Sequence, residues 1–270
     1  MKRIPKSFMR TLAVIAVLSA PLAMLAQDLK PIDLPKPQIT GGMPLMEALS
    51  ARKTTREFAP DKLPAQMLSN LLWAAFGVNR AEIPGRAPKP GRTAPSAMNL
   101  QEIDLFLAYP EGVYLYEPVR HRLVPVIAKD LRAMTNRNAA AATAPVCFIF
   151  VEDMDKRPAP PAKPPVAGVP TGGVPPAGAP PAKPQVAGVP PAGAPPAGVP
   201  QAGTGQIAPI RATSGEVDTG FIGQNIYLFC ASAGLNAWFY GTNREQLAKE
   251  MNLRPGQRVL YGQAVGFPKK

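Results

Sequence analysis

The stretch Val146-Cys-Phe-Ile-Phe-Val151 decides the fold class of this 270-residue chain. All six residues are apolar, and such a continuous apolar run is typical of a central strand of a sheet. The sequence therefore predicts a sheet with this segment in its interior, and the neighbouring segments should supply the other strands and the covering helices.

Helical patterns lie on both sides of this strand. Residues 64–76 place their apolar side chains at helical spacing, and Gly77 supplies a stop. Thr213-Ser-Gly-Glu216 has capping-box spacing and predicts the start of a long, mostly apolar helix that ends near Gly234. Shorter helices are expected at 44–51 and 243–251.

Strand patterns fill the remaining core-like segments. Residues 103–109 alternate apolar and polar side chains, 112–116 and 122–127 suit a hairpin, and 258–266 reads as a final strand. Helices and strands follow one another without a regular βαβ rhythm, which predicts an α+β fold with a central mixed sheet. No GxGxxG follows a strand, which argues against a dinucleotide-binding Rossmann domain.

Residues 157–205 interrupt the patterned segments. They consist mostly of Pro, Ala, Gly and Val, and 160–179 recurs at 180–199 with 15 of 20 positions identical. Such a composition cannot bury enough apolar surface to offset the entropy lost on ordering, so we expect a disordered insert. It is either a surface insertion without a catalytic role, or a spacer or an arm that contacts the cell envelope. A single domain is then built from 42–156 and 206–270.

Residues 1–26 combine a basic start with an apolar run and are typical of a secretory signal peptide cleaved after Ala26. The expected location is periplasmic or secreted, and the alternative is an uncleaved membrane anchor. A flexible mature N-terminus, 27–41, should follow. Cleavage would lower the net charge from +12 to +8. The cations are scattered without interleaved aromatics, which argues against a nucleic-acid partner.

Few residues suit metal or acid–base chemistry. Cys147 and Cys230 lie in apolar segments and are expected to be buried free thiols, although an exported protein could oxidise them. His121 is the single histidine and is expected to be exposed, so neither a metal site nor a Ser-His-Asp hydrolase is predicted. Glu102 and Asp104 are expected on the exposed side of a strand, and we do not assign them as an acid–base pair.

Two polar motifs flank the helix predicted at 64–76. Ala51-Arg-Lys-Thr-Thr-Arg-Glu-Phe58 clusters three cations and two hydroxyls, which suit a phosphate-like anion. Arg92-Thr-Ala-Pro-Ser-Ala-Met-Asn-Leu-Gln101 contains amides that can both donate to and accept from a flat heterocycle. Together they suggest a nucleotide or flavin site. Taken alone, the first motif would be read as a solvated face after a helix, and the second could be a turn with helix-capping residues.

The motifs occur in the order found in the nitroreductase family, which the chain resembles over 42–151 and 217–268. The resemblance rests on MPLMEAL, ARKTTREF, LLWAAFGVNR, GRTAPSAMNLQ and DTGFIGQNIYLFCASAGLNA, followed by AVGFP. It is closest to the branch that includes flavin-dependent azoline oxidases. It implies an α+β homodimer that holds FMN at the subunit interface, with each flavin contacted by both chains.

The resemblance also implies the residues that contact the cofactor. The phosphate and ribitol would be bound by Arg52, Lys53, Thr54 and Arg56, and Lys269 or Lys270 would complete the phosphate site. Arg56 alternatively approaches the polar edge of the ring. The turn that contacts the flavin would comprise Pro95, Ser96 and Asn99, with Gln101 nearby. The segment beside the reactive ring nitrogen would comprise Phe239, Tyr240 and Gly241.

The expected function is an FMN-dependent oxidoreductase that passes hydride to or from a small electron-poor substrate, with NAD(P)H as a possible donor. No side chain is assigned a catalytic role, because the flavin carries the chemistry. The alternative is an exported binding or envelope-associated protein on the same scaffold that has lost its flavin.

Overall fold

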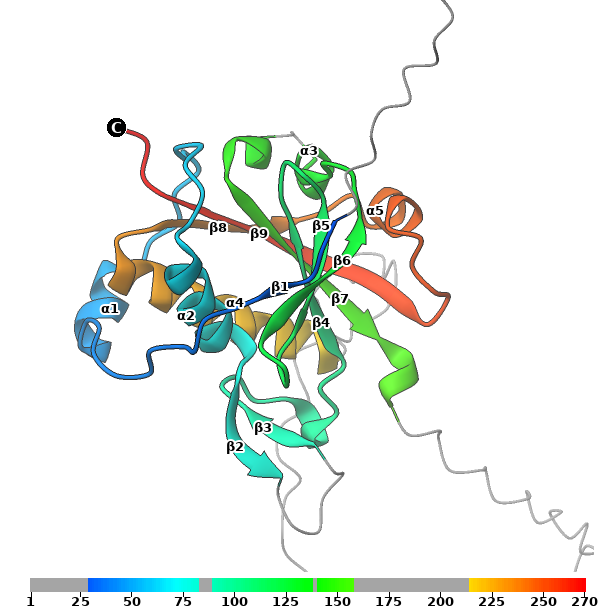
Figure 1. The fold of residues 1–270 in the computed structure, drawn as a ribbon, viewed down its shortest axis with the longest axis horizontal. Coiled ribbons are helices and arrows are strands. Elements are labelled where there is room, and N and C mark those ends of the chain that lie inside the picture. The colour runs from blue at the N-terminus through cyan, green and yellow to red at the C-terminus, as the bar shows by residue number, and fades with distance from the viewer. Residues whose placement is uncertain (1–28, 83–88, 138–139, 158–213) are drawn as a thin grey trace, which may run out of the picture. The chain divides into compact units, whose positions relative to one another are not determined.

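A computed structural model of the chain describes residues 29–82, 89–137, 140–157 and 214–270 (Figure 1). The predicted signal peptide lies outside the described residues, as does the predicted insert apart from Arg157. Thr213, the first residue of the predicted capping box, also falls outside them. Among the helices that are described, none is both long and apolar enough to cross a membrane.

A seven-stranded sheet forms the centre of the described part of the chain (Figure 1). Its strands, in spatial order, are β1 (Ile32–Asp33), β6 (Arg122–Ile127), β5 (Val113–Glu117), β4 (Ile103–Ala108), β7 (Val146–Asp153), β9 (Gln257–Gly266) and β8 (Asn236–Gly241). Every neighbouring pair is antiparallel, whereas we expected a mixed sheet. Two of these pairs, β4–β5 and β5–β6, are hairpins between consecutive strands, a connection that makes neighbouring strands antiparallel.

Strand β7 occupies the interior of this sheet, as its apolar run predicts. All eight of its residues are buried. Because side chains alternate between the two faces of a strand, Phe148 and Phe150 join one hydrophobic cluster while Cys147 and Ile149 join the other. The sheet is therefore covered on both faces.

Helices α2 (Ala65–Phe76) and α4 (Ser214–Ala233) contribute to the first cluster, and α3 (Arg132–Thr135) and α5 (Arg244–Glu250) lie beside the second. In α4 the buried residues Ile222, Ile226 and Cys230 recur every four positions, so one stripe faces the sheet. The α+β class is confirmed. The remaining elements are α1 (Leu45–Ala51), the hairpin β2 (Val78–Glu82) with β3 (Pro90–Arg92), and the short 3₁₀ helices η1 (Ala97–Asn99), η2 (Ala140–Thr143) and η3 (Met154–Lys156).

The two residues that bracket the span 158–213 meet at a pair of buried carboxylates. Arg157 donates to Glu102 (3.1 Å), to Glu152 and to the Ser214 hydroxyl (2.9 Å). Ser214 in turn donates to Glu102 over 2.7 Å. We call these four residues the insert root. The expectation that Glu102 is exposed was wrong: its side chain is 0% exposed, because Arg157 and Ser214 cover it.

Candidate functional site

The first polar motif runs from the end of α1 along the edge of β8. The Thr55 backbone N–H donates to the Ala237 carbonyl over 3.0 Å, and Phe58 is buried in the second hydrophobic cluster. The Thr54 hydroxyl lies 2.9 Å from the hydroxyl of Tyr227 on α4. These contacts hold the 52–58 segment between α4 and the sheet.

The cations of this segment are not neutralised by nearby acids. The Arg52 guanidinium lies over the Tyr227 ring at 5.3 Å, and Arg56 lies over the Trp238 ring at 5.4 Å. Within the described ranges, no carboxylate comes within ion-pair distance of Arg52, Lys53 or Arg56. The segment therefore offers positive charge to an anion.

Lys53 lines a cavity of about 270 Å³ beside this segment, which we call the anion cavity. Its wall contains no acidic side chain. Pro268 also lines it, so the C-terminal Lys269 and Lys270 follow directly from the wall. Lys53 and Pro268 thus line the same cavity. The full wall comprises Ala51, Lys53, Tyr227, Cys230, Ala231, Gly234, Leu235, Asn236 and Pro268.

The second motif folds into a strained turn around η1, which begins directly after Pro95 and Ser96. Met98, Asn99 and Gln101 all adopt positive φ angles of 51–55°, a region that non-glycine residues rarely occupy. The Gln101 amide donates to the Asn99 side chain (2.9 Å), and the Gln101 N–H donates to the Ser96 hydroxyl (2.8 Å). Asn99 and Gln101 are both buried. In this chain their side chains organise the turn.

Asp218 on α4 anchors this turn, and sequence reasoning missed it. Its carboxylate accepts from the Ala97 N–H at 3.1 and 3.3 Å. Burial is the main cause that raises the pKa of Asp218. The signal available in the sequence was an acid one turn inside a mostly apolar helix, after Glu216 in its first turn.

Both motifs therefore attach to α4, but at different places. The first contacts Tyr227 and the second contacts Asp218. Nine residues separate these anchors, which is about 13.5 Å along the helix axis and about two and a half turns. A half-integral number of turns puts them on opposite sides of α4. In the described part of the chain, Ala51 and Lys53 of the first motif and Arg92 and Gln101 of the second line different cavities.

The third predicted segment lies in β8, a strand that we did not predict. The Phe239 N–H donates to the Tyr227 hydroxyl over 2.8 Å, so Tyr227 joins this segment to the first motif. The Tyr240 side chain is buried, and its hydroxyl lies 2.9 Å from the Thr135 hydroxyl. Tyr240 is therefore part of the core. The space beside Gly241 is open, because a Cβ atom at this position would meet no other atom within 4 Å.

His121, Asp104 and the two cysteines, which the sequence singled out as titratable groups, all lie outside both motifs. His121 was expected to be exposed, but it is half-buried between Ser69 (2.7 Å) and Tyr116 (2.9 Å). Asp104 pairs with Lys156 over 2.5 Å. Cys147 and Cys230 are buried free thiols, as expected, and burial raises the pKa of Cys147 to about 11. No cluster of three potential metal ligands occurs in the part of the chain that the structure describes.

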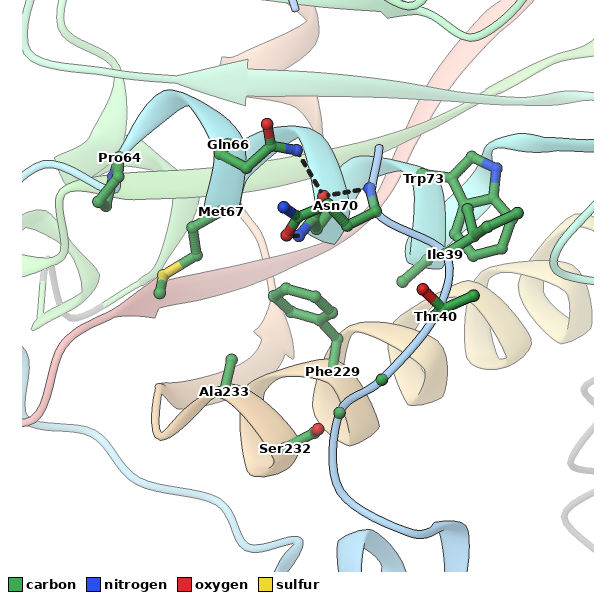
Figure 2. Close-up of a pocket in the computed structure, with 14 residues that line it drawn as sticks. Ile39, Thr40, Pro64, Gln66, Met67, Asn70, Trp73, Phe229, Ser232 and Ala233 are labelled. Atoms are coloured by element: carbon green, nitrogen blue, oxygen red, sulfur yellow. Dashed lines mark hydrogen bonds between the residues drawn. The ribbon is translucent and has the colours of Figure 1, made fainter. Parts of the chain in front are cut away.

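A larger cavity, of about 580 Å³, lies between α2 and α4 (Figure 2). None of the residues predicted from the two motifs lines it. It is therefore distinct from the anion cavity.

Comparisons with known proteins agree with this architecture. A model described as "Nitroreductase family" matches residues 49–172. Three proteins, each described as a "putative nitroreductase", are similar. A solved structure from Ralstonia eutropha JMP134 is 33% identical with a TM-score of 0.64, and the alignment covers 90% of this chain and 91% of that one.

The other two relatives are more distant. A solved structure from Anabaena variabilis is 15% identical with a TM-score of 0.54 over 90% of this chain and 42% of that one, which supports the fold alone. A curated protein from Methanocaldococcus jannaschii is 28% identical over 116 residues, or 42% of this chain. The match spans 58% of that relative's own length.

Proposed function

Because this chain belongs to the nitroreductase family, we propose that it is a flavin-dependent oxidoreductase that uses FMN and acts on a small electron-poor organic substrate. The observation that supports this proposal is the anion cavity. Lys53 lines it, and within the described ranges no acid forms an ion pair with Lys53, Arg52 or Arg56. Such a donor set suits the phosphate of FMN. When bound, FMN supplies the hydride transfer.

The chain's own residues would bind and orient the cofactor. Lys53, with Lys269 or Lys270, would bind the phosphate. Tyr227 would position the first motif, since its hydroxyl bonds both the Thr54 hydroxyl and the Phe239 N–H. Arg56 would lie near the polar edge of the ring, where a cation stabilises the negative charge that reduction creates.

We further propose that the active form is a homodimer. The two motifs attach to opposite sides of α4, so a second copy is needed to bring the 95–101 turn to the same flavin as the 52–56 segment. The outer face of α1 offers a surface for that copy, because Leu45, Met46 and Leu49 are 63%, 75% and 43% exposed. Large exposed apolar side chains of this kind mark an interface.

The finer assignments also remain proposals. NAD(P)H is the proposed electron donor, export through the N-terminal segment is the proposed location, and the proline-rich insert is a candidate for envelope contact. The order of its motifs is the basis for proposing that the chain belongs near the azoline-oxidase branch of the family.

The test is whether the purified protein carries flavin. We expect a yellow protein whose absorbance shows flavin bands and which releases FMN on heating. Replacing Arg52 and Arg56 together by alanine should abolish retention. Arg120→Ala is the matched control, because Arg120 lies in the turn between β5 and β6, is not a lining residue of either cavity, and pairs with Glu117 at the surface. A colourless protein that does not bind added FMN would refute the proposal.

A further inference from the structure

The larger cavity has walls from three segments of the chain (Figure 2). Helix α2 contributes one side and the C-terminal part of α4 contributes the other. The segment 38–43, which we call the strap, crosses between them. Met67 and Phe229 extend into the space between the two helices, and Trp73 lies at one end.

The strap is fixed to both helices. The Gln38 N–H donates to the Asn70 side chain on α2 over 2.8 Å, and the Met43 N–H donates to the Ser232 hydroxyl on α4 over 2.8 Å. Between these contacts Gly41 and Gly42 adopt φ angles of +87° and +90°, which glycine tolerates and other residues rarely adopt. The wall is therefore held in place without a ligand, as ligand pockets usually are.

The lining specifies the chemistry of an occupant. None of the fourteen lining residues is charged, which disfavours an ionic ligand. Ile39, Met67, Trp73 and Phe229 provide apolar and aromatic surface. The side-chain amides of Gln38, Gln66 and Asn70 gather on one wall and form hydrogen bonds with one another. Amides that both donate and accept can fix the orientation of one polar group on a ligand.

We propose that this cavity is a second ligand site, which binds a neutral, flat, mostly apolar organic molecule carrying a carbonyl or a similar hydrogen-bonding group. A volume of about 580 Å³ lies within the range of small-molecule pockets. The exposed apolar side chains of α1 do not line the cavity, so the surface proposed for a second copy is separate from it.

The second site lies across α4 from the anion cavity. Phe229, Ser232 and Ala233 line the larger cavity, whereas Ala231 and Gly234 line the anion cavity. One helix thus carries both sites on different faces. This inference does not depend on whether the chain binds FMN.

Alanines two positions apart on α4 give a matched pair of variants. Ala233 and Ala231 are both half-buried, and each lines a different cavity. A phenyl ring at position 233 should fill the larger cavity, and one at 231 should fill the anion cavity. Thr40→Trp provides a second way to block the larger cavity, from an exposed position on the strap.

The experiment titrates the purified protein with prodan, a neutral naphthalene ketone whose emission shifts to the blue in apolar surroundings. We expect saturable binding of one probe per chain, weakened about tenfold or more in Ala233→Phe and Thr40→Trp and unchanged in Ala231→Phe. Flavin retention should show the opposite pattern, so a failure of the cofactor assignment is distinguishable from a failure of this one.

Two results would overturn the second site. One is equal prodan binding by the wild-type protein, Ala233→Phe and Thr40→Trp. The other is wild-type binding that falls as protein concentration rises, which would mean that a second copy of the chain covers the cavity.

Discussion

Replacing Arg157 by methionine should lower the free energy of unfolding by about 3 kcal/mol. Arg157 contacts both carboxylates of the insert root, and the side chains of Glu102 and Glu152 are 0% exposed. Removing one partner of a buried ion pair costs about 3–5 kcal/mol, because the remaining charge is left uncompensated. Glu152 keeps its contact with Arg258 and Glu102 keeps the Ser214 hydroxyl, so we expect the lower end of this range.

Urea unfolding followed by circular dichroism measures this loss. Two controls sharpen the result. Arg120→Met removes an exposed pair with Glu117 and should cost less than about 0.5 kcal/mol. Adding Glu102→Gln to Arg157→Met removes the uncompensated charge and should recover about 1 kcal/mol or more. A loss below about 1 kcal/mol for Arg157→Met, or no recovery in the double variant, would show that the root does not stabilise the domain as we reason.

Three further predictions follow from contacts described above. Tyr227→Phe removes two hydrogen bonds around the first motif and should weaken FMN retention about tenfold in equilibrium dialysis, with normal retention arguing against a positioning role. Burial lowers the pKa of His121, so the folded state binds fewer protons than the unfolded state and stability should fall as pH drops below 6.5. Urea unfolding at pH 7.5 and 5.5 should show a smaller pH-dependent loss in His121→Gln than in the wild type, and equal losses would refute this. Replacing Leu45 and Leu49 on the exposed face of α1 by glutamate should yield monomers without flavin in light-scattering measurements, whereas an unchanged dimer would place the interface elsewhere.

The sequence predicts those elements whose side chains follow a local period. The apolar run of β7 and the four-residue recurrence in α4 each report a buried face directly, so both elements lie where expected. Strand β8 was missed because its six residues include glycine and asparagine and are only partly buried. It is held in the sheet by the neighbouring strand β9.

Long-range pairing explains the errors in the candidate site. Glu102 directly precedes β4, so strand alternation suggested exposure, but its partners Arg157 and Ser214 lie 55 and 112 residues away. His121 likewise meets Ser69 from 52 residues away. A local pattern carries no information about such contacts. The cluster of cations at 52–56, in contrast, is visible within five residues, and its role in binding a phosphate stays a prediction.

The insert root joins the chain segments on either side of residues 158–213. A protease cut between those segments should therefore leave the domain assembled. Strand β7 precedes residues 158–213, while β8, β9 and α4 follow them, and β7 pairs directly with β9 along eight positions. A protein nicked at an engineered cleavage site in the repeats should therefore stay assembled as two complementary fragments. The halves should co-elute on gel filtration and separate only in denaturant.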